Sequence, residues 1–131
     1  SMMANRGVLT APRLLRDRRS ILGEVVALPP AQGRVQLGSR AAAETMIGAM
    51  QAVVTNPRGT GRRAPVPGLS IAMKTGTAGE RPGLQALIVA FAPAEQPRIA
   101  FGLIAEDAGP AEIAGAKIAH DFLERIKGRL Q

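Results

Sequence analysis

The chain has 131 residues, no cysteine, tryptophan or tyrosine, and a formal net charge of +7. This length suits one domain or part of one, and the apolar fraction of 46% is sufficient for a hydrophobic core. The lack of cysteine excludes disulfide frameworks and thiolate metal sites, and no stretch approaches the roughly 18 to 20 apolar residues of a membrane span.

The positive charge is unevenly distributed. Residues 1–20 carry five arginines and one aspartate, and residues 57–82 carry five basic residues and one glutamate. Two basic segments indicate an anionic ligand or an anionic surface nearby, although a solvated arginine-rich surface explains them equally well. The cluster Arg13, Arg16, Arg18 and Arg19 could bind phosphates, but nucleic acid is not an expected partner because no aromatic residue for base stacking lies near it.

The N-terminal third shows only weak secondary-structure signals. Residues 2–7 resemble the tail of a helix that Gly7 ends. Residues 8–15 are extended at best, because Pro12 restricts them to an edge strand or a loop. Residues 21–28 have the composition of a strand.

A helix is predicted over residues 40–54, with Ser39 as its N-cap. Its apolar side chains recur at helical spacing: Ala42, Met46, Ala49, Met50 and Val53. Residues 55–61 then break the helix and begin a loop rich in glycine, proline and arginine.

Three strands are predicted next, over residues 69–77, 86–92 and 98–106. Residues 93–97 connect the last two and have the length of a hairpin loop. These three segments therefore predict an antiparallel sheet.

Gly109 and Pro110 are expected to open a final helix, with Glu112 in its first turn, where the helix dipole favours an acid. Its apolar stripe comprises Ile113, Ala116, Ala119, Leu123, Ile126 and Leu130. A helix, three antiparallel strands and a terminal helix predict an α+β fold with an antiparallel sheet flanked by helices.

The most informative motif is Lys74-Thr75-Gly76-Thr77, at the end of the first predicted strand. Strand alternation directs Lys74 and Gly76 to one face and Thr75 and Thr77 to the other. A lysine on an edge strand can simply discourage aggregation. Its place in a K-T-G sequence instead indicates the active-site strand of the serine penicillin-recognising enzymes.

From residue 2 to residue 130 the chain resembles the C-terminal part of the transpeptidase domain of high-molecular-weight penicillin-binding proteins. The resemblance lies in residues 3–9, 49–54, 59–61, 71–78 and 89–93, which occur in the family's order. It implies that residues 1–131 form a C-terminal segment of that domain, with a partial transpeptidase fold made of the K-T-G strand, hairpin and terminal helix.

The resemblance also implies roles for the motif. Lys74 would be the catalytic-site cation. Thr75, Gly76 and Thr77 would bind substrate, the two hydroxyls contacting a carboxylate and the Thr77 backbone N–H serving as an oxyanion donor. Gly76 would let a substrate backbone pair with the strand.

The family's other two motifs are missing from these residues. None of Ser1, Ser20, Ser39 and Ser70 has a lysine three positions later, so S-x-x-K is absent, and S-x-N is absent too. We therefore expect no nucleophile among these residues. The chain would be a segment of a serine-type D,D-transpeptidase, an enzyme that works through an acyl-enzyme, and the segment alone would be inactive. The alternative is a basic module that binds protein or nucleic acid through a remnant of this fold.

Partners and location follow from the same resemblance. A peptidoglycan stem peptide or a β-lactam would bind the complete enzyme, and the N-terminal part of the domain would be the structural partner. Self-association is possible without it. The expected location is the cell envelope, on the extracytoplasmic side of the inner membrane, with any signal or anchor on other sequence. No cofactor and no metal are expected, since one histidine, His120, cannot build a metal site.

Overall fold

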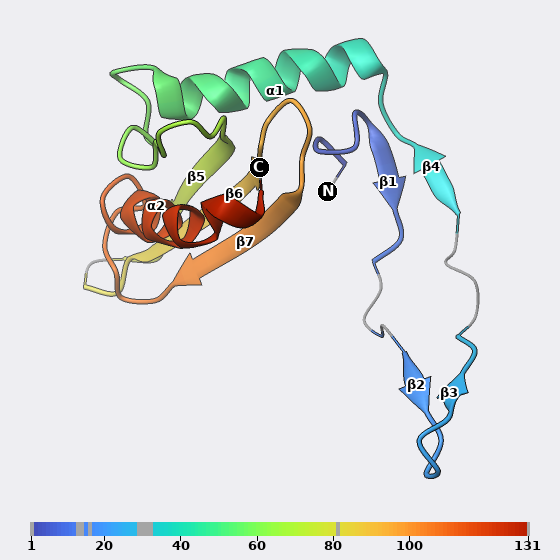
Figure 1. Cartoon of the computed structure of the whole chain (residues 1–131). Helices are drawn as coiled ribbons and strands as arrows, with labels where there is room; N and C mark the ends of the chain where they lie inside the picture. The colour runs from blue at the N-terminus through green and yellow to red at the C-terminus, as the bar shows by residue number, and fades with distance from the viewer. Residues whose placement is uncertain (1, 13–14, 16, 29–32, 81, 131) are drawn as a thin grey trace.

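The computed structural model describes residues 2–12, 15, 17–28, 33–80 and 82–130. A three-stranded antiparallel sheet lies between two helices, and a narrow arm of short strands extends away from it (Figure 1). The predicted α+β class is therefore confirmed. Within the described ranges, no helix combines the length and the apolar character needed to cross a membrane.

The central sheet consists of β5 (Ala72–Ala78), β6 (Gln85–Ala92) and β7 (Ile99–Ala105), in the order β5-β6-β7. All three expected strands are present, and the 93–97 connection forms the predicted hairpin. The first strand begins three residues later than expected. Leu69 donates its N–H to Val66 at 3.1 Å in a tight turn, so it is not available for the ladder with β6.

Helix α1 (Arg40–Thr55) confirms the prediction made from its cap and its periodicity. Ser39 Oγ accepts a hydrogen bond from Ala42 N–H at 3.1 Å, which satisfies one of the free donors of the first turn. The helix crosses one face of the sheet, where Ile47 packs with Ala72 and Phe91 in a buried cluster (Figure 1). This contact holds the start of β5 in place.

The opposite face of the sheet is covered by α2 (Ala114–Ile126) and by the short 3-10 helix η1 (Lys127–Arg129). The expected stripe is largely correct, since Ala116, Ala119 and Leu123 are fully buried against the sheet.

The start of this helix was predicted wrongly. Residues 111–113 form a turn in which Ala116 N–H donates to Ala111 at 2.8 Å, a wider ring than that of an α-helix. Glu112 therefore precedes the helix instead of lying in its first turn, and Ile113 is half exposed.

The arm contains two short antiparallel ladders. Strand β1 (Val8–Thr10) pairs with β4 (Arg34–Gln36), and β2 (Arg18–Arg19) pairs with β3 (Val25–Val26). The strand expected over 21–28 is reduced to β3, because a turn closed by Gly23 N–H to Ser20 at 2.9 Å occupies its first half. Arg13 and Arg16 of the arginine cluster, and Leu14 of the segment 8–15, lie outside the described residues.

Residues 2–7 form hydrogen-bonded turns where the tail of a helix was expected. Gly7 N–H donates to Met2 and Arg6 N–H donates to Met3, both at 3.0 Å. Arg6 and Gly7 both have positive φ, 55° and 93°. Many helices end with this pattern, but residues 2–7 themselves are not helical, so the prediction of a helix tail was wrong.

Candidate functional site

Strand β5 lies at one edge of the central sheet and carries the K-T-G sequence. Met73 and Thr75 are buried on the α2 side, whereas Lys74 and Gly76 are exposed on the α1 side, which agrees with the alternation expected of a strand. In the described part of the chain only β6 pairs with β5. The other side of the β5 backbone is therefore available for a further hydrogen-bonding partner.

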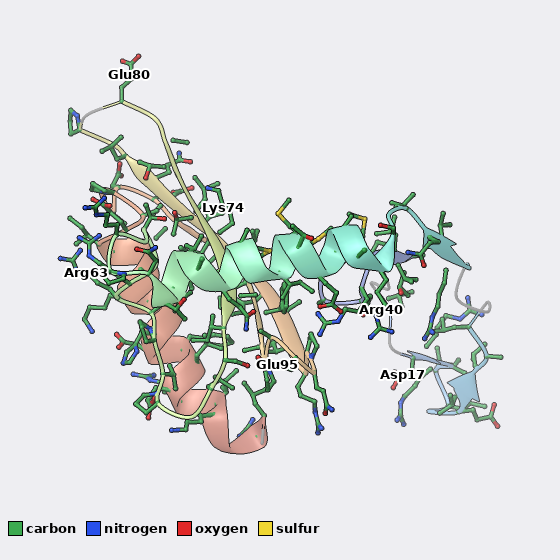
Figure 2. The ribbon with its side chains drawn as sticks, turned by 90° about the horizontal axis from the view of Figure 1, so that it is seen from above. Asp17, Arg40, Arg63, Lys74, Glu80 and Glu95 are labelled. Carbon is green, nitrogen blue, oxygen red and sulfur yellow. The ribbon has the colours of Figure 1, made fainter. Side chains whose placement is uncertain are left out.

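Lys74 lies opposite Val89 of β6, and its ammonium group donates a hydrogen bond to the carbonyl of Thr75. Seen from above α1, Lys74 and Glu95 lie on opposite sides of that helix (Figure 2). The lysine forms none of the described ion pairs. Its charge is therefore not neutralised by a carboxylate of the described residues.

The side chain of Thr75 is directed away from Lys74. Its relative exposure is 7%, and its Oγ1 lies 2.6 Å from Oγ1 of Thr60. Thr60 belongs to the Gly59-Thr60-Gly61 sequence and is itself exposed. The sequence predicted a loop here but gave no signal for its contact with the K-T-G strand.

Gly76 and Thr77 complete the motif. Thr77 Oγ1 accepts a hydrogen bond from Ala111 N–H at 3.1 Å, which ties β5 to the turn that precedes α2. A Cβ added at Gly76 would meet only Leu87 Cβ, at an ordinary contact distance of 3.7 Å. Packing within the chain therefore does not require glycine at this position, and its exposed face is open to approach by a ligand.

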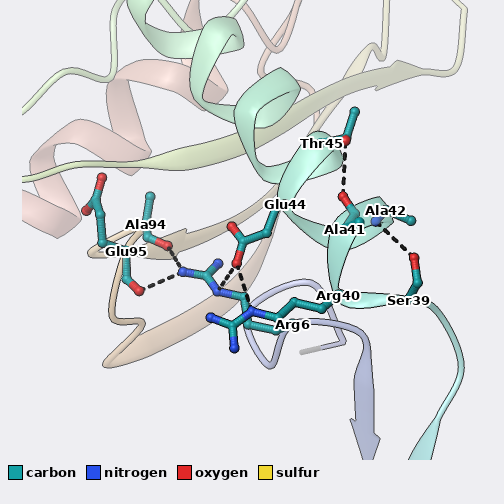
Figure 3. A network of polar contacts seen from close by, with 9 residues as sticks. All are labelled: Arg6, Ser39, Arg40, Ala41, Ala42, Glu44, Thr45, Ala94 and Glu95. Carbon is teal, nitrogen blue, oxygen red and sulfur yellow. Dashed lines mark hydrogen bonds and ion pairs between the residues drawn. The ribbon is translucent and has the colours of Figure 1, made fainter.

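A separate polar network holds the N-terminal turn against α1 and the 93–97 hairpin. Arg6 pairs with Glu44 at 3.0 Å and donates to the carbonyls of Ala94 and Glu95 at 3.2 and 2.6 Å (Figure 3). Arg40 reaches the same Glu44 oxygen at 3.7 Å.

The carboxylate of Glu95 is also constrained. It accepts hydrogen bonds from the Ser70 hydroxyl and, at 3.2 Å, from the side chain of Gln51. The Ser70 hydrogen bond is the main cause that lowers the pKa of Glu95 below its usual value of 4.5, with smaller contributions from its own backbone N–H, Gln51 and Arg6. The network stabilises the hairpin.

The remaining sequence candidate is His120, whose Nδ1 lies 2.9 Å from the carbonyl oxygen of Pro65. This contact connects α2 to the loop before β5. Across the residues that the structure describes, no three acidic or histidine side chains converge as a metal site would require.

Comparison with known proteins shows the family to which this fold belongs. The profile of the penicillin binding protein transpeptidase domain matches residues 1–126. A search of curated proteins found no match.

Solved structures with the same fold come from several bacteria. The D,D-transpeptidase domain of a peptidoglycan glycosyltransferase from Eggerthella lenta is 30% identical, with a TM-score of 0.79, and the match covers 98% of this chain and 30% of that one. Penicillin binding protein 3 from Mycobacterium tuberculosis, complexed with aztreonam, is 25% identical, with a TM-score of 0.81 and coverages of 98% and 33%. Pseudomonas aeruginosa PBP2 in complex with WCK 5153 is 29% identical, with a TM-score of 0.70 and coverages of 95% and 27%. The chain thus spans about a third or less of the length of these structures.

Proposed function

Because the chain belongs to the penicillin binding protein transpeptidase family, we propose that β5 is the substrate-binding K-T-G strand of a peptidoglycan D,D-transpeptidase. In this proposal residues 1–131 are the C-terminal segment of the transpeptidase domain. The serine nucleophile and its lysine lie on sequence other than these residues. Penicillin-binding proteins are cell-envelope enzymes, and we assign this one to the extracytoplasmic side of the inner membrane.

The chemistry of acyl transfer explains what such a strand contributes. The attack of a serine on a peptide carbonyl develops negative charge on the carbonyl oxygen, which donors fixed in advance can stabilise. In our proposal the backbone N–H of Thr77 is one such donor. A cation nearby orients the substrate, whose terminal carboxylate is recognised by charge and by hydroxyl groups.

The single observation that carries the proposal is the environment of Lys74. Its side chain is exposed on β5, has no acidic partner among the described residues, and lies beside a glycine that packing does not require. An exposed lysine on an edge strand can also discourage aggregation, and the neighbouring glycine is what favours a binding role. Thr75, Gly76 and Thr77 supply the substrate-binding part of the same strand.

The decisive experiment measures acylation by a penicillin in the longer transpeptidase polypeptide that contains both this segment and the nucleophile. Lys74→Ala should slow acylation by about a hundredfold or more, since removal of one electrostatic contributor commonly costs this much. It should leave the thermal midpoint almost unchanged, because the side chain is exposed. Arg62→Ala, an exposed change in the adjoining loop, is the matched control and should have a small effect. Equal acylation rates for Lys74→Ala and wild type would refute the assignment.

The 131-residue chain alone provides a second test. No serine in it is followed by the lysine that would activate it, so a labelled penicillin should form no stable adduct. Intact-protein mass spectrometry measures this directly. An adduct on the isolated chain would show that the nucleophile lies within these residues.

A further inference from the structure

The far end of the arm carries the most exposed large apolar side chains of the described residues. β2 and β3 lie at this end, and the turn 20–24 that joins them extends away from the central sheet (Figure 1). Ile21 and Leu22 in the turn are 103% and 81% exposed, and Val25 beside them is 69% exposed. None of the described residues between 8 and 36 is buried. The arm therefore has no core that could cover these side chains, and only another surface can do so.

The backbone of this turn is suited to an apolar environment, because its donors are used within the turn. Ser20 N–H donates to the Glu24 carbonyl and Gly23 N–H donates to the Ser20 carbonyl, both at 2.9 Å. Ser20 Oγ accepts from the N–H groups of Leu22 and Glu24 at 3.2 and 3.3 Å. A backbone that leaves water must satisfy its polar groups internally, and these four donors already do.

Positive charge lies directly behind the apolar turn. Arg18 and Arg19 are exposed and form none of the ion pairs between described residues. Arg18 lies opposite Val26 and Arg19 opposite Val25, so one arginine lies on each face of the ribbon. Over residues 8–36 the sequence contains five arginines and only two acidic residues, Asp17 and Glu24.

We propose that the arm docks on an anionic lipid surface. The side chains of Ile21 and Leu22 enter the boundary of the hydrocarbon, and Arg18 and Arg19 bind the phosphate groups of the lipid heads. Two residues separate Arg19 from Ile21, roughly 7 Å along a strand. Peripheral segments enter a membrane by about 5–10 Å, so the arginines would lie at the level of the headgroups. This layering of cation above apolar group, with complementary charge, favours a lipid surface over a groove on another protein.

Vesicle binding by the 131-residue chain tests the proposal. The probes are vesicles of phosphatidylglycerol mixed with phosphatidylcholine, and vesicles of phosphatidylcholine alone as the neutral control. Ile21→Ser combined with Leu22→Ser should lower the partition coefficient on the anionic vesicles about tenfold or more. Arg18→Gln combined with Arg19→Gln should lower it by about tenfold on these vesicles and hardly change it on neutral ones. Glu24→Gln, which removes an acid from the turn, should raise it severalfold.

A matched control separates the arm from the exposed face of the central sheet. Val89→Thr combined with Ile104→Thr makes that face more polar and should leave vesicle binding unchanged. All of these positions are exposed except Val89 and Ile104 in part, so thermal midpoints should stay close to wild type and show that each variant is folded.

An environment-sensitive fluorophore locates the contact, and the lack of native cysteine makes its attachment specific. A label on Ile21→Cys should become brighter and emit at shorter wavelength when anionic vesicles are added. A label on Glu124→Cys, at an exposed position of α2, should not respond.

Equal binding of wild type and the Ile21 and Leu22 variant would overturn the proposal, as would equal binding to neutral and anionic vesicles or a silent label at position 21. If the wild-type chain binds neither kind of vesicle, the proposal is also wrong, and a groove on another protein is then the surface that covers the turn.

Discussion

The carboxylate of Glu95 shows how a single residue can stabilise the framework of the site from a distance. Ser70 stands two residues before β5, and the Glu95 side chain accepts its hydroxyl proton. Ser70 Oγ in turn accepts from Ala94 N–H at 2.9 Å, which joins the hairpin to the chain as it enters the K-T-G strand. All these interactions favour the ionised form of Glu95.

Stability should therefore depend on pH through Glu95. Its pKa is lowered in the folded state, so its contribution is fully present above the unfolded pKa, near 4.5, and is lost as the pH falls through the folded value. Thermal midpoints measured from about pH 6 down to about pH 3 should fall more steeply for wild type than for Glu95→Gln. Glu124→Gln, which removes an exposed carboxylate from α2, is the control and should retain the wild-type slope. Parallel curves for wild type and Glu95→Gln would contradict the role of this carboxylate.

At the scale of elements, two glycines in neighbouring segments play opposite roles. Gly48 lies inside α1, and an added Cβ there would meet nothing within 4 Å. Gly59 lies just beyond the end of the same helix, where a Cβ would collide with the backbone of Val53. The first glycine is replaceable and the second is required.

Alanine substitutions should separate these roles. Gly48→Ala should raise the free energy of unfolding by about 0.5–1 kcal/mol, because glycine weakens a helix interior by that amount. Gly59→Ala should lower it by about 1–3 kcal/mol, since backbone atoms must move to admit the methyl group. Chemical denaturation of the two variants beside wild type measures both. A Gly59→Ala variant as stable as wild type would show that the loop is not held as the structure indicates.

On the scale of the whole molecule, α1 leaves part of its face of the sheet uncovered. Beyond the buried contact of Phe91 with Ile47, the side chains of Val89 and Ile104 are 55% and 67% exposed on this face. Ile21 and Leu22 are also largely exposed, in the turn of the arm. Exposed apolar groups on a flat sheet favour association with another surface.

We therefore expect the isolated 131-residue chain to self-associate in sedimentation experiments. Val89→Thr combined with Ile104→Thr should shift it toward monomer, because these changes make the uncovered sheet face more polar. Ile21→Thr, in the arm, is the comparison and should change the association less. A compact monomer at high concentration for the wild-type chain would rule the expectation out.

Local signals in the sequence were sufficient for the main elements. Ser39 and the apolar spacing of residues 40–54 predicted α1, because capping and helical periodicity act within a few residues. The strands β6 and β7 and most of β5 followed from apolar runs bounded by turn residues. The α+β class and the family resemblance followed from the order of these segments and their motifs.

Other features depend on contacts between distant residues, and only the tertiary structure decided them. The ladders of the arm contain two or three residue pairs each, too few for periodicity to reveal. The late start of α2 depends on a wide turn beside β5, to which Thr77 is bonded. The hydrogen bond between Thr60 and Thr75 joins residues 15 positions apart, in a loop and a strand. A motif read along the chain predicts Thr75 for the site, but the partner of its buried hydroxyl is decided by the loop that packs beside it.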